Sequence, residues 1–390
     1  MAYLRENFEN SLHDNQHGFR SGLSCVTQLA ATVHDIWAQV DKHHSIQVVA
    51  LDFAKAFDKV SHDILISKLL RLKLNSSIVR WIASFLADRK QVVFIEGQKS
   101  QEILVSSGVP QGSVLRPVLL LFYVNDMFSA VKSATLKLYA DDALLYLPLD
   151  SMNNRRFQVD LDCLSLWADA NKMQFNTKKC YSIFFSREQY LPTVEHRLSG
   201  NVLQRVLSIK YLGVTLSENL SWNLHISNTV AKAYCTLGLI KKICYGAPDS
   251  VKLAAYKVLC RSQLEYASKV WDPFTKTNTE KIEMVQHWTL RFICNLKGIC
   301  SIEEARKSVE LDTLEERRRA SRRQLFLRIL AGENVHESLS RCFPGLVATV
   351  QGCQTRASLA EMPQAFSANY DGYLHSFIPR TSREIRFHRY

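Results

Sequence analysis

The 390-residue sequence lacks the cysteine patterns that mark a structural metal site. Its ten cysteines form no C-x-x-C pair and no zinc-finger spacing with a nearby pair of histidines, which argues against a zinc finger. In a chain of this length we interpret them as reduced, mostly buried cysteines, which predicts an intracellular protein.

Long apolar runs are also missing. The most apolar run, 117–124 (PVLLLFYV), is far too short to span a bilayer and follows Arg116. The N-terminal MAYLRENFENSLHD is charged and has no apolar signal-peptide core. No repeat period or low-complexity linker is evident. We therefore expect no membrane association.

The composition is that of an ordinary globular protein with an excess of positive charge. Hydrophobic residues make up 47% and charged residues 22%, and the length predicts two or three domains. The net charge is +12. Such a positive excess has two interpretations. Either it serves solubility alone, or the protein binds a polyanion whose phosphates pair with Lys and Arg.

Hydrophobic periodicity predicts a mixed region followed by a helical one. The mixed region contains a buried strand at 46–53, helices that begin near Ser61 and Ser77, a hairpin at 91–105, a loop at 108–112, a helix to about 128, a hairpin at 136–146, a helix at 157–171, a strand at 181–185 and a hairpin at 209–216. From about residue 220 the spacing is helical. The segment 306–328 contains eight Lys or Arg residues and four acidic residues. This composition predicts either a phosphate-binding face or a solvated charged helix.

One short segment points to chemistry. LKLYADDALLY at 136–146 places Asp141 and Asp142 side by side between apolar residues. A surface turn is the simplest explanation of an acid pair, but these flanks are typical of core strand, where ionised aspartates are rare unless paired or bound to metal. Asp52, which closes the strand at 46–53, would lie beside the pair if the two strands were neighbours.

Three such carboxylates repel one another unless a cation neutralises them. With no His or Cys nearby, the oxygen donors predict Mg²⁺ or Mn²⁺ rather than zinc. Two such ions about 4 Å apart activate a 3′-hydroxyl and stabilise a pyrophosphate leaving group.

Several ordered motifs resemble one family, the reverse transcriptases of non-LTR (LINE-type) retrotransposons, particularly the jockey-like group. The motifs are QHGFRSGLSC at 16–25, LDFAKAFDKVSH at 51–62, GVPQGSVLRPVLLLFYVND at 108–126, YADD at 139–142, NTKKC at 176–180, KYLGVTL at 210–216, YASKVWDP at 266–273 and LDTLEERRRASRRQL at 311–325. YADD alone is a weak match, but so many motifs in the right order are specific.

The resemblance implies an α+β fold, a right-hand polymerase palm with an antiparallel sheet and helices. It implies partial fingers at 1–45, the palm at 46–217, a helical thumb at 218–305 and a basic C-terminal region at 306–390. The implied activity is RNA-directed DNA polymerisation, which adds dNTPs to a DNA primer on an RNA template with two Mg²⁺ or Mn²⁺ ions. The implied location is the nucleus at the site of action, with ribonucleoprotein assembly in the cytoplasm.

The resemblance also assigns residues to roles, motif by motif. The metal ligands would be Asp52 and Asp141, with Asp142 weaker, and Lys179 would donate a proton to pyrophosphate. Phe57 would exclude a 2′-hydroxyl, Gln111 and Gly112 would approach the templating pair, and Arg20 would hold a phosphate. The primer grip would be Tyr211, Leu212 and Gly213. Asp58, Asn125 and Asp126 would be structural hydrogen-bonding residues.

The sequence departs from the family pattern in ways that favour a rival reading. Most of the fingers, an N-terminal endonuclease and a C-terminal zinc knuckle are missing, which predicts a truncated copy. The rivals are a catalytically inactive remnant that only binds nucleic acid, and a DNA-templated or template-independent polymerase. Arg116 stands where a small residue is expected, and we expect it to crowd the helix that follows, so that Arg116→Gly raises thermal stability and incorporation.

Overall fold

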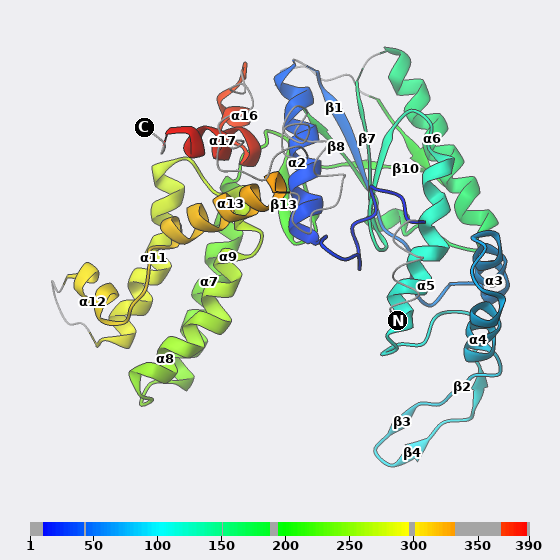
Figure 1. The fold of residues 1–390 in the computed structure, drawn as a ribbon, viewed down its shortest axis with the longest axis horizontal. Helices are drawn as coiled ribbons and strands as arrows, with labels where there is room; N and C mark the ends of the chain where they lie inside the picture. Colours follow the sequence, from blue (N-terminus) through cyan, green and yellow to red (C-terminus); the bar gives the residue numbers. More distant parts are fainter. Residues whose placement is uncertain are drawn as a thin grey trace. The chain divides into compact units, whose positions relative to one another are not determined.

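The computed structural model describes residues 11–42, 44–149, 151–187, 194–295, 301–331 and 368–387. It divides into two units (Figure 1). The first contains Met1–Gln28 and His44–Leu207, and the second contains Leu29–His43 and Ser208–Tyr390. Helix α2 (Cys25–Asp41) therefore begins in the first unit and continues in the second.

The first unit is built on a five-stranded sheet. The strand order is β11-β8-β1-β7-β6, and every pair is antiparallel except β8 with β11. The strands are β1 (Ile46–Leu51), β6 (Thr135–Tyr139), β7 (Asp142–Pro148), β8 (Tyr181–Phe185) and β11 (Gln204–Arg205). Five of the six residues of β1 are buried, as its continuous apolar run predicts. The α+β prediction is confirmed.

The helices of this unit follow the predicted pattern. They are α3 (His62–Arg71), α4 (Ser76–Leu86), α5 (Leu115–Val124), α6 (Ser151–Ala170), and the 3₁₀ turns η1 (Asn125–Ala130) and η2 (Thr177–Lys179). Helix α5 buries seven of its ten residues, so this helix runs through the core. Helix α6 is longer than predicted, and Phe157, Leu161 and Leu164 form its buried face.

The hairpin predicted at 91–105 forms, but its side chains are not buried. Strand β2 (Lys90–Gln91) pairs with β5 (Ile103–Leu104), and β3 (Phe94–Ile95) pairs with β4 (Gln98–Lys99). All four strands are exposed, and Figure 1 shows the hairpin extending away from α4. A second small hairpin joins β9 (Arg197–Leu198) to β10 (Asn201–Val202).

Asn125 and Asp126 have the structural role that the resemblance implied. Asn125 Oδ1 accepts from His13 N, and its Nδ2 donates to Ser11 O. Asp126 Oδ1 accepts from Lys68 Nζ at 2.7 Å and from Trp167 Nε1 at 2.9 Å. These bonds satisfy polar groups between α3, η1 and α6.

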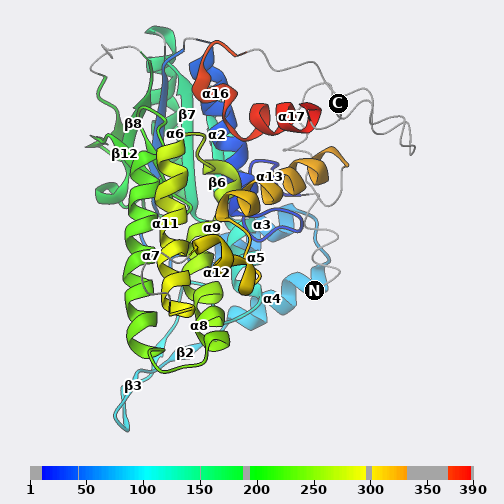
Figure 2. The ribbon, with the colours of Figure 1, turned by 90° about the vertical axis from the view of Figure 1, so that its left-hand side faces the viewer.

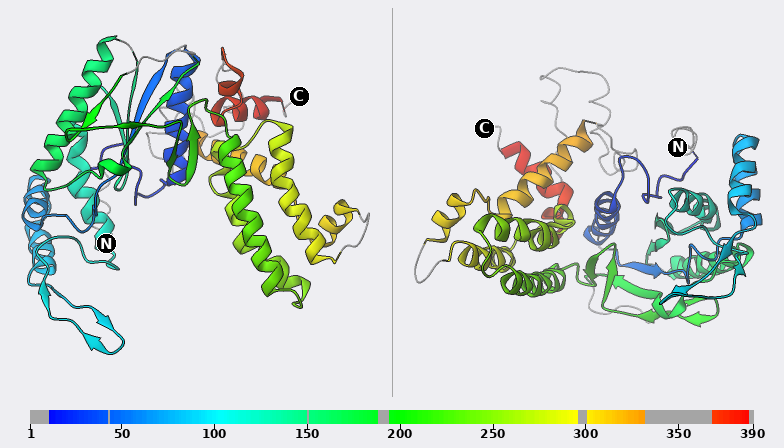
Figure 3. Two further views of the ribbon diagram at one scale, coloured as in Figure 1. Left: turned by 180° about the vertical axis from the view of Figure 1, so that it is seen from behind. Right: turned by 90° about the horizontal axis from the view of Figure 1, so that it is seen from below.

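Within its described residues, the second unit is helical apart from one hairpin. Its elements are β12 (Ser208–Tyr211), β13 (Val214–Ser217), α7 (Asn223–Ile243), α8 (Asp249–Ala255), the π-helix η3 (Tyr256–Arg261), α9 (Ser262–Glu265), α10 (Ser268–Trp271), α11 (Lys276–Ile293), α12 (Ile302–Ser308), α13 (Leu314–Leu330), α16 (Asp371–Leu374) and α17 (Phe377–Phe387). Helices α7 and α11 lie side by side (Figures 2 and 3).

The β12–β13 hairpin belongs to this helical unit, although the sequence assigned it to the palm. Among the described residues its two strands pair with each other alone, and Thr215 N donates to His225 Nδ1 of α7. The periodicity predicted the hairpin correctly but contained no information about the neighbour on which it packs.

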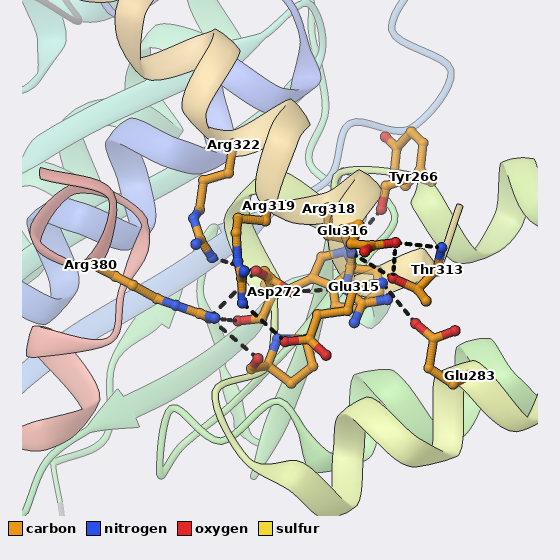
Figure 4. Close-up of polar contacts among 12 residues, drawn as sticks. Tyr266, Asp272, Glu283, Thr313, Glu315, Glu316, Arg318, Arg319, Arg322 and Arg380 are labelled. Carbon is orange, nitrogen blue, oxygen red and sulfur yellow. Dashed lines mark hydrogen bonds and ion pairs between the residues drawn. The ribbon is translucent and has the colours of Figure 1, made fainter. Parts of the chain in front are cut away.

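Two arginines of the basic helix α13, Arg318 and Arg322, are buried, and others of this helix form ion pairs nearer the surface. Arg317 forms a two-point ion pair with Glu265, and Arg319 pairs with Glu315. Arg318 is 1% exposed and donates to Asp272, which also receives Arg322 and Arg380 (Figure 4). Arg317 and Arg318 therefore have carboxylate partners, whereas Arg319 is exposed, so a phosphate-binding face on this helix stays a prediction.

The expectation that the cysteines are reduced and mostly buried is met only in part. The seven described cysteines are all free, but only Cys180 and Cys260 are buried, and Cys235 is exposed. Cys300, Cys342 and Cys353 lie outside the described residues. None of the helices among the described residues combines the length and the apolar character that a bilayer crossing requires.

Candidate active site

The sheet register brings Asp52 and the aspartate pair together. Leu51 of β1 lies opposite Ala143 of β7, so the next step of the antiparallel register sets Asp52 opposite Asp142. Asp141 and Ala140 form the turn between β6 and β7, and Ala140 has a left-handed φ of 58°. The predicted juxtaposition of Asp52, Asp141 and Asp142 is thus a consequence of pairing two buried strands.

The electrostatics show that these carboxylates repel one another. Burial and the negative charges of Asp141 and Asp52 raise the pKa of Asp142 to about 6. The pKa of Asp141 is also raised, mainly by burial and in part by Asp52, while the Arg116 charge opposes the rise. Asp142 is the most exposed of the three, so water screens part of its repulsion.

The loop that contains the N-terminal QHGFR motif forms hydrogen bonds with the turn at Ala140 and Asp141. Gln16 is fully buried, and its Oε1 accepts from Ala140 N at 2.9 Å and from Gly18 N at 2.8 Å. Its Nε2 lies 3.4 Å from Ala140 O. A Cβ on Gly18 would lie 2.4 Å from Ala140 N, so only glycine permits this approach.

On the other side, Asp52 is attached to the segment that precedes β8. Asp52 N donates to Cys180 Sγ at 3.3 Å, and Asp52 O accepts from Asn176 N at 2.7 Å. Burial raises the pKa of the Cys180 thiol to about 11, so the sulfur stays protonated at neutral pH. Lys179 lies in the 3₁₀ turn η2, between Asn176 and Cys180, and its side chain is exposed.

The loop at 108–112 is attached to the segment that follows Asp52. Val109 N donates to Phe57 O, Gly108 N donates to Val60 O, and His62 Nε2 contacts Gly108 O at 2.8 Å. A Cβ on Gly108 would lie 2.8 Å from Asp58 O, and its φ of 89° also favours glycine. Gln111 and Gly112 are exposed beyond these bonds.

Arg116 does not crowd the core as expected. Its guanidinium lies over the Phe57 ring, with Cζ 4.5 Å from the ring centroid, and its Nη2 is 3.8 Å from Asp58 Oδ1. Its side chain is 20% exposed. The helix start at Leu115 turns Arg116 away from the buried face of α5, so the expectation of overpacking is wrong.

The same side chain lines a cavity of about 410 Å³ beside the 108–112 loop. Arg89 and Lys90 also line it, as do Gln111 and Asp58. Lys90 pairs with Glu102 at an exposed position, where water weakens the pair. Three cations against one lining carboxylate make this cavity favourable for an anion.

Two other groups of predicted residues have different surroundings. Arg20 is 7% exposed and its Nη1 donates to the carbonyls of His13 and Gln16, which argues against the phosphate role expected for it. Tyr211, Leu212 and Gly213 form the turn of the β12–β13 hairpin in the second unit.

Comparison with known proteins identifies the family. Residues 2–216 match the sequence profile described as "Reverse transcriptase (RNA-dependent DNA polymerase)". The chain belongs to the reverse transcriptase family.

Two of the curated relatives come from Drosophila melanogaster. The chain is 28% identical over 319 residues to "Probable RNA-directed DNA polymerase from transposon BS", covering 78% of this chain and 35% of that protein. It is 29% identical over 296 residues to "RNA-directed DNA polymerase from mobile element jockey", covering 71% of this chain and 31% of that protein. The chain thus spans about a third of the length of these relatives.

One solved structure is similar to this chain at a lower sequence identity. "Structure of apo telomerase from Candida Tropicalis" aligns with a TM-score of 0.45 and 14% identity, covering 93% of this chain and 58% of that one. A TM-score this low supports no further comparison.

Reverse transcriptases generally use divalent metals, and the carboxylates of this chain fit such an ion in part. Among the described residues, no three His, Cys, Asp or Glu side chains are close enough to form a complete metal site. Mg²⁺ does not need one, because it is commonly bound by one or two carboxylates together with substrate phosphates and water. The raised pKa values of Asp141 and Asp142 mark the excess negative charge that a cation would neutralise.

Gln16 was missed as a site residue by the sequence reasoning, which took only Arg20 from the QHGFR motif of this reverse transcriptase. The motif gave a signal only in that it contains Gly18, a residue type that permits a close backbone approach. Only the structure shows that this contact is with Ala140, 124 residues away.

We predict that Gln16→Ala destabilises the first unit by at least about 2 kcal/mol, because the buried Ala140 and Gly18 amides lose their acceptor. Urea unfolding followed by tryptophan fluorescence measures this loss. Gln101→Ala, at an exposed hairpin position, is the matched control and should unfold like the wild type. Equal midpoints for both variants would show that Gln16 does not hold the turn.

We predict a pH-dependent effect of Asp142→Asn. The folded-state pKa of Asp142, about 6, exceeds its ordinary value of 3.8, so the ionised form is unfavourable in the folded state at pH 7. This cost disappears as the pH falls through 6 toward 4, where the folded state takes up the proton first. In EDTA, Asp142→Asn should therefore melt higher than the wild type at pH 7, with the difference shrinking toward pH 4. Asp169→Asn, an exposed change on α6, should show no such trend.

Proposed function

We propose that this chain is the RNA-directed DNA polymerase domain of a non-LTR retrotransposon, which adds dNTPs to the 3′-end of a DNA primer on an RNA template. The observation that supports it most is the meeting of Asp52 with Asp141 and Asp142 at the ends of paired strands inside a reverse transcriptase sheet. We expect this activity at nuclear DNA, after ribonucleoprotein assembly in the cytoplasm.

In this proposal Asp52 and Asp141 hold two Mg²⁺ or Mn²⁺ ions, with Asp142 as a weaker ligand. The ions would supply Lewis acidity toward the 3′-hydroxyl and the pyrophosphate. The rigid attachments of Asp52 to Asn176 and of Ala140 to Gln16 keep the carboxylates together against their repulsion. Lys179, exposed beside Asp52's segment, is the proposed proton donor to pyrophosphate.

The nucleotide and template would lie on the surface that the 108–112 loop forms. Phe57 would exclude a ribose 2′-hydroxyl, since its ring is half-buried beside this loop. Gln111 and Gly112 are free of side-chain cover and would approach the templating base pair. The cavity with Arg89, Lys90 and Arg116 would receive phosphates of the nucleic acid.

The proposal predicts that primer extension depends on the carboxylates. On poly(rA)/oligo(dT) with Mg²⁺ or Mn²⁺, Asp52→Asn and Asp141→Asn should each lose more than about a hundredfold in rate, because a metal ligand stabilises the transition state by several kcal/mol. Asp169→Asn is the control and should keep wild-type activity. A wild type that binds the duplex but never extends the primer would indicate the inactive remnant instead. Extension on DNA templates alone, or without any template, would indicate the other rival polymerases.

The position of Arg116 gives a second prediction. Arg116→Gly should lower thermal stability, because it removes a cation–π contact worth about 0.5–1 kcal/mol and adds glycine to the first turn of α5. It should also lower the KM for dNTP, because the Phe57 ring becomes accessible to the sugar. Arg116→Lys keeps the charge and serves as the control for electrostatics. A KM that rises in Arg116→Gly and recovers in Arg116→Lys would show instead that Arg116 binds the triphosphate.

A further inference from the structure

The turn of the β12–β13 hairpin has a backbone that is unfavourable for its sequence. Tyr211 pairs with Val214, so Leu212 and Gly213 are the two central residues of a tight turn. Both have positive φ, 44° for Leu212 and 83° for Gly213. Two positive values suit a type I′ hairpin turn, but a branched leucine adopts them only with support from its surroundings.

Tyr266 supplies that support at both residues. Its hydroxyl donates to Leu212 O at 2.9 Å, although the two are 54 positions apart in the chain. Its ring covers Gly213, where an added Cβ would lie 2.9 Å from Tyr266 Cε1. Tyr266 is 44% exposed, so the ring and the turn share a surface that water and ligands reach.

The segment that carries Tyr266 is itself anchored at both ends. Before it, Glu265 forms the ion pair with Arg317 of α13. After it, Trp271 Nε1 donates to Tyr266 O at 2.8 Å, and Asp272 receives Arg318, Arg322 and Arg380 (Figure 4). Arg318 and Asp272 are almost fully buried, and breaking a pair of this kind is strongly destabilising. The inward-facing arginines therefore fix the backbone from which Tyr266 projects.

We propose that Tyr266 is a positioning residue for the primer terminus, which acts by holding the Leu212–Gly213 turn in its strained conformation. This inference rests on the proposed function and on the primer-grip role that the family resemblance implies for Tyr211, Leu212 and Gly213. Helix α13 then supports this turn through the ion pairs of Arg317, Arg318 and Arg322.

The test uses the whole chain and Tyr266→Phe, which keeps the ring against Gly213 and removes only the hydroxyl. Single-turnover incorporation on an RNA-template/DNA-primer duplex should slow by about two- to tenfold, the range expected for one hydrogen bond. The Kd for dNTP, the Kd for the duplex and the melting temperature should not change. Tyr245→Phe, which alters a tyrosine 84% exposed in the same unit, should leave all four values at the wild-type level.

A second measurement needs no catalysis, so it separates this inference from the proposed function. A primer that carries 2-aminopurine at its 3′-end is bound without dNTP, and its emission reports the position of the terminal base. Tyr266→Phe should change the emission at the 3′-end but not that of 2-aminopurine placed ten positions upstream. If the wild type never extends the primer, the proposed function fails while this emission change still supports the positioning role.

Two results would overturn the inference. One is a Tyr266→Phe protein whose rate and terminal emission both equal those of the wild type. The other is a Tyr266→Phe protein with a lower melting temperature, in which the 2-aminopurine emission changes equally at the 3′-end and ten positions upstream. That result would show that the hydroxyl has only a structural role.

Discussion

Repulsion among three carboxylates is the constraint on which the first unit depends. Pairing β1 with β7 buries two apolar strands and, in the same step, brings Asp52 beside Asp141 and Asp142. The strand pairing is favourable because it buries apolar surface, and the charge cluster is its unfavourable consequence. The neighbouring contacts make sense as restraints on this cluster: Gln16 fixes Ala140, Asn176 fixes Asp52, and the Arg116 charge partly offsets Asp141.

The second unit solves a different electrostatic problem. In its most basic helix, α13, Arg318 and Arg322 are buried and form ion pairs with Asp272. An arginine paired with a carboxylate adds nothing to the net charge of +12, so that excess lies on other side chains. The cations that line a cavity, Arg89, Lys90 and Arg116, belong to the first unit instead.

The sequence predicted the elements well because local hydrophobic spacing determines them. The strand at Ile46–Leu51, the hairpin around Asp141 and the helices from Asn223 onward are confirmed, since their apolar faces are written in consecutive residues. What it missed depends on partners distant in the chain. The clamp of Gln16 on Ala140, the stacking of Arg116 on Phe57 and the burial of Arg318 on Asp272 each join segments that no local pattern connects. The exposure of the hairpin strands β3 and β5 was likewise not predicted, because alternation predicts strand pairing but not which layer covers the strands.

The central claim is that Asp52, Asp141 and Asp142 bind divalent cations within a reverse transcriptase sheet. The most direct measurement is Mn²⁺ binding, followed by electron paramagnetic resonance and by calorimetry at pH 6, for the wild type and Asp52→Asn with primer–template duplex present. We expect Mn²⁺ binding by the wild type with release of protons, because burial and the neighbouring carboxylates raise the pKa of Asp142 to about 6, and much weaker binding by the variant. Equal Mn²⁺ affinity in the two proteins would contradict the central claim.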